Sequence, residues 1–328
     1  MGRGRSPATP PAASPSRRRP STCSAKEYSM TDSNRPAIGF IGLGLMGSAM
    51  VERLQGLGYP LTVIANRSRK GVDAALGRGA TEAKTARELA AASDFVLLCM
   101  DTSASVESRV YGEDGVIAGL KPGAVVIDFG TSLPGSTIAI GAAVEKAGGR
   151  YMDAPLGRTP SHAVDGKLNI MAAGAAEDFS RAEPVFNDLG ENVFHVGALG
   201  AGHTLKLINN FFGMTTACAM SEAFAMADKA GLSRQTLYDV MAAGPLRSGM
   251  MDFVKAYAID GNPEMLAFSI ANGRKDVSYY GAMADGLGVP SVMSPATKQA
   301  LGIAVATGNS DRYVAHMVDF FSSLFEDK

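Results

Sequence analysis

The stretch Pro36-Ala-Ile-Gly-Phe-Ile-Gly-Leu-Gly-Leu-Met-Gly-Ser-Ala-Met50 decides the fold of this 328-residue chain. Residues 37–41 are a short apolar run that predicts a buried strand, and residues 48–57 carry apolar side chains at helical spacing. Between them, three glycines make the pattern G-x-G-x-x-G: Gly42, Gly44 and Gly47. This pattern alone is weak in a chain with 38 glycines, but its place between a strand and a helix indicates a dinucleotide-binding site.

The bulk composition indicates a folded protein with two domains or one large one. Of all residues 46% are hydrophobic and 19% are charged, and the net charge is −1. This charge gives no general attraction to nucleic acid or acidic membranes, and no apolar run is long enough to span a bilayer. The widely spaced cysteines suggest neither a disulfide framework nor a metal site: Cys23, Cys99 and Cys218. We therefore expect a cytoplasmic protein that has no metal, no nucleic acid and no membrane as partner.

Residues 1–35 differ from the rest of the chain. They are rich in Pro, Ser and Arg and almost lack large apolar side chains, so we expect a disordered extension. A transit peptide is one interpretation, although scattered prolines argue against the amphipathic helix it needs. An arm for nucleic acid or membranes is another. We favour a translated upstream extension with the true start at Met30.

Strands and helices alternate up to about residue 198. Apolar runs predict strands at residues 37–41, 61–65, 95–100, 124–128, 151–153, 168–172 and 192–196. Residues 135–147 and 175–189 have helical patterns, and residues 153–160 resemble a loop. This alternation predicts an α/β fold with a Rossmann-type, doubly wound parallel sheet, whose ligands bind at the carboxyl ends of the strands. Three residues lie at such ends: Met100, Asp101 and Thr131.

The pattern becomes all-helical after Gly197. A long helical stretch covers about residues 203–230, and no strand signal follows it. Further helices are predicted at residues 234–243, 273–287, 294–306 and 311–325. We therefore divide the chain into a disordered extension (1–35), a dinucleotide-binding domain (36–198) and an all-α C-terminal domain (199–328). The apolar side chains of the long helix suggest a homodimer or homotetramer.

The end of the second strand bears on the choice between NAD and NADP. A site that prefers NAD usually has Asp or Glu there to bind the ribose 2′-hydroxyl, but this chain has Asn66-Arg67-Ser68. Arg67 can pair with a 2′-phosphate, and its neighbours can add hydrogen bonds. The alternative is an ordinary polar turn. We expect NADP(H) to be favoured and NAD(H) to be possible.

A dehydrogenase also needs a group that moves a proton at the substrate oxygen. The chain has four histidines. His195 falls in a predicted strand and His316 in a late helix, which favours structural roles. His162 and His203 lie near the proposed cleft, but neither has an evident carboxylate partner in sequence. Lys206 is the better candidate, because apolar neighbours and a nearby helix N-terminus lower the pKa of a lysine. Asn209 and Asn210 follow on the same helix face. The alternative is a solvent-facing lysine on an amphipathic helix.

Arg158 is a candidate for the substrate. It stands in a Pro/Gly-rich loop near the carboxyl end of the sheet, where a guanidinium suits a carboxylate or sulfonate. A surface salt bridge is the alternative. The pair Lys275-Asp276 says little alone, because such pairs are common on solvated faces.

Together these motifs resemble the β-hydroxyacid dehydrogenases, which include 3-hydroxyisobutyrate dehydrogenase, tartronate semialdehyde reductase and sulfolactaldehyde reductase. The resemblance runs from about residue 37 to the C-terminus. Its motifs stand in the family's order: Gly42-Leu-Gly-Leu-Met-Gly47, Asp128-Phe-Gly-Thr-Ser-Leu-Pro134, Asp153-Ala-Pro155 with Gly166, Gly202-x-x-x-Lys206-x-x-Asn209-Asn210, and Lys275-Asp276.

The resemblance implies roles for these residues. Lys206 would be the general acid in reduction and the base in oxidation, and Asn209 and Asn210 would position the substrate. Thr131 and Lys275 would lie against the nicotinamide side of the cofactor or the substrate. The implied cofactor-binding residues are Gly42, Gly44, Leu45, Met46, Gly47, Asn66, Arg67, Ser68, Met100, Asp101, Thr131 and Lys275.

The chain departs from the family pattern at the substrate. Gly130 stands where the family has Ser, and the usual P-V-S-G-G loop is Pro155-Leu-Gly-Arg-Thr159. The Gly-Arg-Thr version resembles the sulfolactaldehyde reductase branch, in which the arginine holds a sulfonate, but Gly213 replaces a serine of that branch. We expect Arg158 and Thr159 to contact the anionic group of the substrate, either a carboxylate or a sulfonate.

The predicted function is reversible, NAD(P)-dependent hydride transfer to a small anionic semialdehyde or from the matching 3-hydroxyacid. An imine reductase on the same scaffold is one alternative, although such enzymes typically have Asp or Tyr where Lys206 stands. A non-catalytic nucleotide-binding module is the other alternative.

Overall fold

The computed structural model describes residues 35–66 and 68–325. The extension predicted for residues 1–35 therefore lies outside the described residues except for Arg35, and so does the predicted cofactor contact Arg67.

The main sheet has six parallel strands in the order β3-β2-β1-β4-β5-β6. Their bounds are β1 (Ile38–Ile41), β2 (Leu61–Val63), β3 (Thr81–Glu82), β4 (Phe95–Leu98), β5 (Val125–Asp128) and β6 (Arg150–Asp153). This is the strand order of the dinucleotide-binding doubly wound fold, and it confirms the predicted fold class. The order reverses between β1 and β4, which is where such folds bind their ligand.

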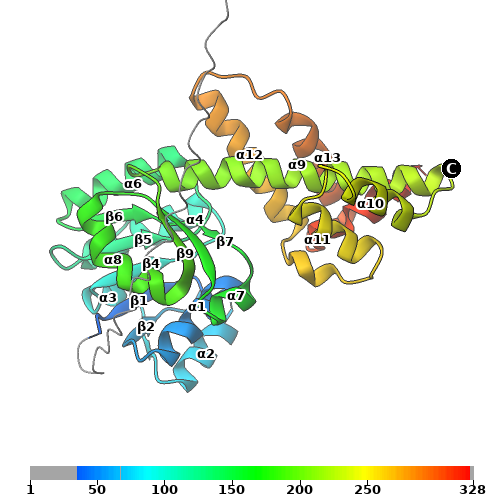
Figure 1. Cartoon of the computed structure of the whole chain (residues 1–328). Helices are drawn as coiled ribbons and strands as arrows, with labels where there is room; N and C mark the ends of the chain where they lie inside the picture. The colour runs from blue at the N-terminus through cyan, green and yellow to red at the C-terminus, as the bar shows by residue number, and fades with distance from the viewer. Residues whose placement is uncertain (1–34, 67, 326–328) are drawn as a thin grey trace, which may run out of the picture. The chain divides into compact units, whose positions relative to one another are not determined.

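Helices cover both faces of this sheet (Figure 1). They are α1 (Leu45–Gly56), α2 (Lys70–Gly77), α3 (Ala86–Ala91), α4 (Ser103–Val110), α5 (Val116–Gly119), α6 (Pro134–Lys146), α7 (Pro160–Val164) and α8 (Ala176–Leu189). Side chains of β5 alternate between the two cores: Val125 and Ile127 pack with one cluster, and Val126 packs with the other. A strand buried on both faces is apolar along most of its length, and β5 has a polar side chain only at its carboxyl end, Asp128.

A second sheet of three strands adjoins the main one in sequence: β7 (Leu156–Gly157), β8 (Leu168–Ala172) and β9 (Gly190–His195). Strand β7 runs antiparallel to β8, and β9 runs parallel to β8. The prediction of a plain loop at residues 153–160 is wrong here. A segment of two residues is too short to show the alternation of apolar and polar side chains that predicts a strand. Leu156–Gly157 is a strand only because it pairs with β8.

The C-terminal region is helical, as predicted. It contains α9 (Ala201–Lys229), α10 (Arg234–Ala242), α11 (Gly249–Ala258), η1 (Pro263–Leu266), α12 (Ile270–Gly286), α13 (Ser294–Ala304), η2 (Val305–Asn309), η3 (Val314–His316) and α14 (Met317–Phe325). Helix α9 continues from beside the main sheet into this region (Figure 1). It packs against α6, β6 and β8, and also against α11, α12 and α14.

The sequence prediction missed α11 and joined two short elements at the C-terminus into one helix at residues 311–325. It also started α12 three residues late: the helix begins at Ile270, where Ser269 accepts a hydrogen bond from the backbone N–H of Asn272.

Candidate active site

A cavity of about 230 Å³ lies at the carboxyl ends of β1, β2 and β4. It brings together three segments that the sequence analysis had assigned to the cofactor: the glycine fingerprint, the end of β2 and the end of β4. The predicted residues that line it are Gly42, Gly44, Asn66, Ser68, Met100 and Asp101.

The three fingerprint glycines differ in what surrounds them. A Cβ on Gly42 would lie 2.3 Å from the carbonyl oxygen of Cys99, and one on Gly47 would lie 1.9 Å from the carbonyl oxygen of Gly42. A Cβ on Gly44 would meet nothing within 4 Å. Packing inside the protein therefore explains the first and third glycines. The open space at Gly44 fits the close approach of a pyrophosphate.

Helix α1 begins directly after Gly44, with Leu45 and Met46 in its first turn. No side chain caps this end, and the first turn holds no acidic residue. The first N–H groups and the positive end of the helix dipole are therefore free to bind phosphate. Together with the cavity, this arrangement fits a dinucleotide cofactor.

Lys275 connects α12 to the strand ends of the main sheet. Its Nζ donates to the carbonyl oxygens of Asp101, at 2.7 Å, and Thr131, at 3.2 Å. It also pairs with Oδ1 of the neighbouring Asp276 at 3.0 Å. Two of these residues, Asp101 and Thr131, come from the ends of neighbouring strands, so a helix of the C-terminal region reaches the edge of the cavity.

A second set of contacts connects Asp276 to α9. Its Oδ2 accepts a 2.6 Å hydrogen bond from Nδ2 of Asn210, whose Oδ1 accepts one from Asn209. Asp276 is 1% exposed. Polar contacts thus connect Lys275, at the edge of the cavity, through Asp276 to the predicted substrate-positioning residues Asn209 and Asn210.

Lys206 lies one turn before Asn210 on α9 and is half-buried. Burial lowers the pKa of its ammonium, the charge of Asp276 raises that pKa, and the charge of Lys275 lowers it. The net effect is a lowered pKa, in the direction that a group exchanging protons near neutral pH requires. Among the described residues, Lys206 has no hydrogen-bond or ion-pair partner, so its amine is available.

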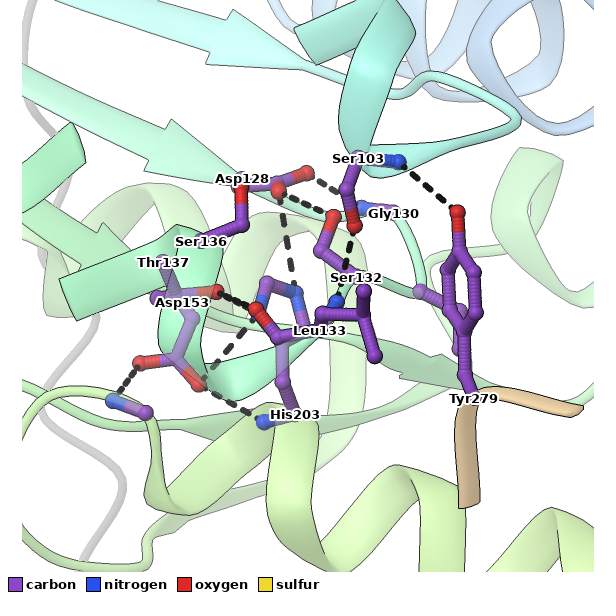
Figure 2. Close-up of polar contacts among 12 residues, drawn as sticks. Ser103, Asp128, Gly130, Ser132, Leu133, Ser136, Thr137, Asp153, His203 and Tyr279 are labelled. Atoms are coloured by element: carbon purple, nitrogen blue, oxygen red, sulfur yellow. Dashed lines mark hydrogen bonds and ion pairs between the residues drawn. The ribbon is translucent and has the colours of Figure 1, made fainter. Parts of the chain in front are cut away.

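Asp153 holds the start of α9 against the end of β6 (Figure 2). Its carboxylate accepts backbone hydrogen bonds from Gly200, at 2.8 Å, and from His203, at 2.7 Å. Burial raises the pKa of this carboxyl group. A Cβ on Gly202 would lie 2.4 Å from the carbonyl oxygen of Met171, so the helix start packs directly on β8. These contacts set the position of Lys206.

The sequence analysis missed the surroundings of His203. Its imidazole is fully buried, with Nδ1 at 2.7 Å from Oγ1 of Thr137. Carboxylate oxygens of Asp128 and Asp153 lie 3.7 Å and 3.8 Å from the ring nitrogens, as Figure 2 shows. These carboxylates are 75 and 50 residues away along the chain, so no local pattern could have found them. The described part of the chain has no group of three or more His, Cys, Asp or Glu side chains suited to a metal ion.

The same aspartate, Asp128, shapes the loop that carries Thr131. Its carboxylate accepts from the N–H of Gly130, at 2.8 Å, and from Oγ of Ser132, at 2.9 Å. A Cβ on Gly130 would lie 2.8 Å from the carbonyl oxygen of Met100. This crowding explains why glycine stands here.

Comparisons with known proteins agree with this geometry. Residues 37–197 match the NAD binding domain of 6-phosphogluconate dehydrogenase. Residues 200–321 match the NAD-binding domain of NADP-dependent 3-hydroxyisobutyrate dehydrogenase. The chain is also 30% identical to 3-sulfolactaldehyde reductase of Escherichia coli (strain K12), over 83% of this chain and 91% of that protein.

The chain belongs to the β-hydroxyacid dehydrogenase family.

Solved structures have the same fold. The Mycobacterium tuberculosis 3-hydroxyisobutyrate dehydrogenase with L-serine aligns with a TM-score of 0.77 at 24% identity, covering 89% of this chain and all of that one. A reductive aminase from Aspergillus terreus aligns less well, with a TM-score of 0.54 at 20% identity, covering 88% of this chain and 100% of that one. Another relative is the cytokine-like nuclear factor N-PAC of Xenopus tropicalis, 29% identical over 84% of this chain; the chain spans 51% of its length.

As a member of the β-hydroxyacid dehydrogenases, the protein is an oxidoreductase with an NAD(P)-binding domain. The fold and the family, predicted from the motifs, are confirmed. Among the described helices, none has the length and apolar character to cross a membrane.

Two predicted substrate contacts of this β-hydroxyacid dehydrogenase, Arg158 and Thr159, directly follow β7 of the second sheet. Arg158 has a φ of 77°, in the left-handed region that favours glycine. Its guanidinium donates to the carbonyl oxygen of Lys167 at 2.6 Å and pairs with Glu191 of β9. Oγ1 of Thr159 lies 2.6 Å from Nδ1 of His162. Neither Arg158 nor Thr159 forms a hydrogen bond or ion pair with Lys206, so their role in substrate binding stays a prediction.

Proposed function

We propose that this protein catalyses reversible hydride transfer between a nicotinamide dinucleotide and a small anionic 3-hydroxyacid or semialdehyde. The observation that supports this most directly is Lys206. Its amine is desolvated, has no hydrogen-bond or ion-pair partner within residues 35–66 and 68–325, and lies on the same helix as a polar group that reaches the cavity at the glycine fingerprint.

The bound cofactor supplies or accepts the hydride at C4 of its nicotinamide. The protein's own contribution is to move the proton. As an ammonium, Lys206 donates to the substrate oxygen in reduction, and as a neutral amine it accepts the proton in oxidation. Burial lowers the pKa of Lys206, which brings the neutral amine closer to neutral pH than it is for an exposed lysine. Asn210, tethered to Asp276, is positioned to orient the substrate.

The substrate and cofactor preferences rest on separate features. The guanidinium of Arg158 in the Gly-Arg-Thr loop suits the carboxylate or sulfonate of a substrate. One relative of the chain, 3-sulfolactaldehyde reductase, is named for a sulfonate substrate. The absence of an acid in Asn66-Arg67-Ser68 favours NADP(H), with NAD(H) possible.

We also propose a homodimer or homotetramer in the cytoplasm. On α9, three apolar side chains are largely exposed at helical spacing: Leu205 at 40%, Ile208 at 46% and Phe212 at 70%. A second copy of the chain is the partner expected to cover them.

The test is Lys206→Met, assayed with a panel of semialdehydes and 3-hydroxyacids, each with NADPH and NADH. The variant should bind NADPH as the wild type does but lose kcat by a factor of at least about 10². Lys229→Met, an exposed lysine on the same helix, is the matched control and should keep full activity. Near-normal kcat in Lys206→Met would refute the assignment, and a wild type inactive with every substrate would leave the nucleotide-binding module as the better reading.

A further inference from the structure

Arg109, which the sequence analysis did not single out, lies beside the end of β2. It sits in the last turn of α4, and its Nη2 donates a 2.9 Å hydrogen bond to Oδ1 of Asn66, 43 residues away in sequence. Asn66 lines the cavity at the glycine fingerprint. Arg109 is not itself among the residues that line this cavity, but its guanidinium lies beside the end of β2, the segment at which dinucleotide sites discriminate between cofactors.

This hydrogen bond determines which way the Asn66 amide faces. A guanidinium carries only donors, so the amide atom it meets must be the oxygen. The Nδ2 group of Asn66 consequently points elsewhere, as a donor. NAD-preferring sites usually offer the carboxylate of an Asp or Glu to the ribose 2′-hydroxyl, and neither Asn66 nor Arg109 carries one.

The remaining groups suit an anion. After this hydrogen bond, Asn66 keeps the N–H donors of its Nδ2, and Arg109 keeps its other N–H donors and its positive charge. These groups match the acceptor oxygens and negative charge of a phosphate.

The charge of Arg109 is also available, unlike that of a nearby arginine. Arg69 pairs with Asp73 at 3.0 Å and with Glu82 at 2.9 Å, so its charge is already balanced. No carboxylate in the described part of the chain pairs with Arg109.

The geometry points to Arg109 as a specificity-determining residue that contacts the 2′-phosphate of NADP(H), with the Asn66 amide as its second donor. This inference rests on the proposed preference for NADP(H) and adds a residue from α4 to it. Its contact does not depend on Arg67, the next residue in the sequence after Asn66.

The experiment measures binding rather than turnover. Titration calorimetry compares two cofactor fragments, 2′,5′-ADP, which carries the 2′-phosphate, and 5′-AMP, which lacks it. In Arg109→Gln, the affinity for 2′,5′-ADP should fall about tenfold or more, because a charge-assisted contact is lost, while the affinity for 5′-AMP stays unchanged. The matched control is Arg78→Gln, an exposed arginine that hydrogen-bonds Gln55 and should alter neither affinity.

The outcomes separate this inference from the proposed function. If the wild type prefers 2′,5′-ADP and Arg109→Gln keeps that preference, the role of Arg109 is overturned and the NADP(H) preference stands. If the wild type binds both fragments equally, the NADP(H) preference and the inference both fail. A loss of 5′-AMP affinity equal to that for 2′,5′-ADP would show a general disturbance of the cavity and would also overturn the inference.

Discussion

Asn210 on α9 and Asp276 on α12 are joined by a 2.6 Å hydrogen bond across 66 residues of sequence. Both side chains are buried, and Asp276 also pairs with Lys275, which reaches the strand ends at the cavity. This pair joins α9, the helix that carries the proposed proton carrier Lys206, to the proposed cofactor site.

The first prediction concerns the pH dependence of Asp276→Asn. The Asp276 charge raises the pKa of Lys206, so its removal lowers that pKa further. Asparagine keeps an acceptor for Asn210. Oxidation needs the neutral amine and should reach its plateau at lower pH than in the wild type. Reduction needs the ammonium, so its rate should begin to fall at a lower pH than in the wild type. The measurement is kcat/KM against pH in both directions.

The control for this prediction is Asp285→Asn, an exposed carboxylate on the same helix, which should leave both profiles in place. Unmoved profiles in Asp276→Asn would contradict the electrostatic coupling of Asp276 with Lys206.

The second prediction is that Lys206→Met is more stable than the wild type. Methionine fills a similar volume without a desolvated charge, so the free energy of unfolding at pH 7 should rise by about 1 kcal/mol. Because the folded-state pKa of Lys206 is lowered, the unfolded chain binds more protons between that pKa and 10.5. Wild-type stability should therefore rise with pH across this window, and the variant should lack that contribution.

Urea unfolding of the cofactor-free protein at pH 7 and at alkaline pH measures both effects. Lys298→Met, at an exposed position of α13, should stay within about 0.5 kcal/mol of the wild type. A less stable Lys206→Met would mean that the ammonium is well solvated in the folded protein.

The third prediction concerns Asp153→Ala. It leaves the buried N–H groups of Gly200 and His203 without their acceptor, which should cost about 2–4 kcal/mol of stability. Because the start of α9 positions Lys206, kcat should fall as well. Denaturation curves and steady-state kinetics at saturating cofactor test this. The exposed Asp165→Ala is the control. Unchanged stability would show that water replaces the carboxylate.

The fourth prediction separates two roles of Arg158. To bind the anionic substrate, the guanidinium must release Glu191 and pair with the substrate instead. In the present pair, Arg158 holds the pKa of Glu191 below its usual range. Arg158→Ala should then raise KM about tenfold, whereas Glu191→Gln, which frees the guanidinium, should leave KM equal or lower. KM values for the best substrate decide it. A KM that Arg158→Ala does not change would leave Arg158 as a structural tie between β7 and β9.

The fold could be predicted from local patterns of apolar residues and glycines in the sequence. The apolar run at residues 37–41, the glycine spacing and the following helix lie within a few turns of chain, and each imposes its conformation through its own sterics and periodicity. The two-residue strand β7 escaped prediction because its pairing partner, not its own sequence, defines it.

The sequence by itself determined the doubly wound sheet, the helical second half and the candidate lysine, because spacing along one strand or helix encodes which side chains share a face. Only the tertiary structure decided the partners. It brought Arg109 to Asn66, two carboxylates to His203 and Asp276 to Asn210. These contacts join residues that are 43 to 75 positions apart in the sequence. They depend on how the sheet and helices pack, which no local periodicity specifies.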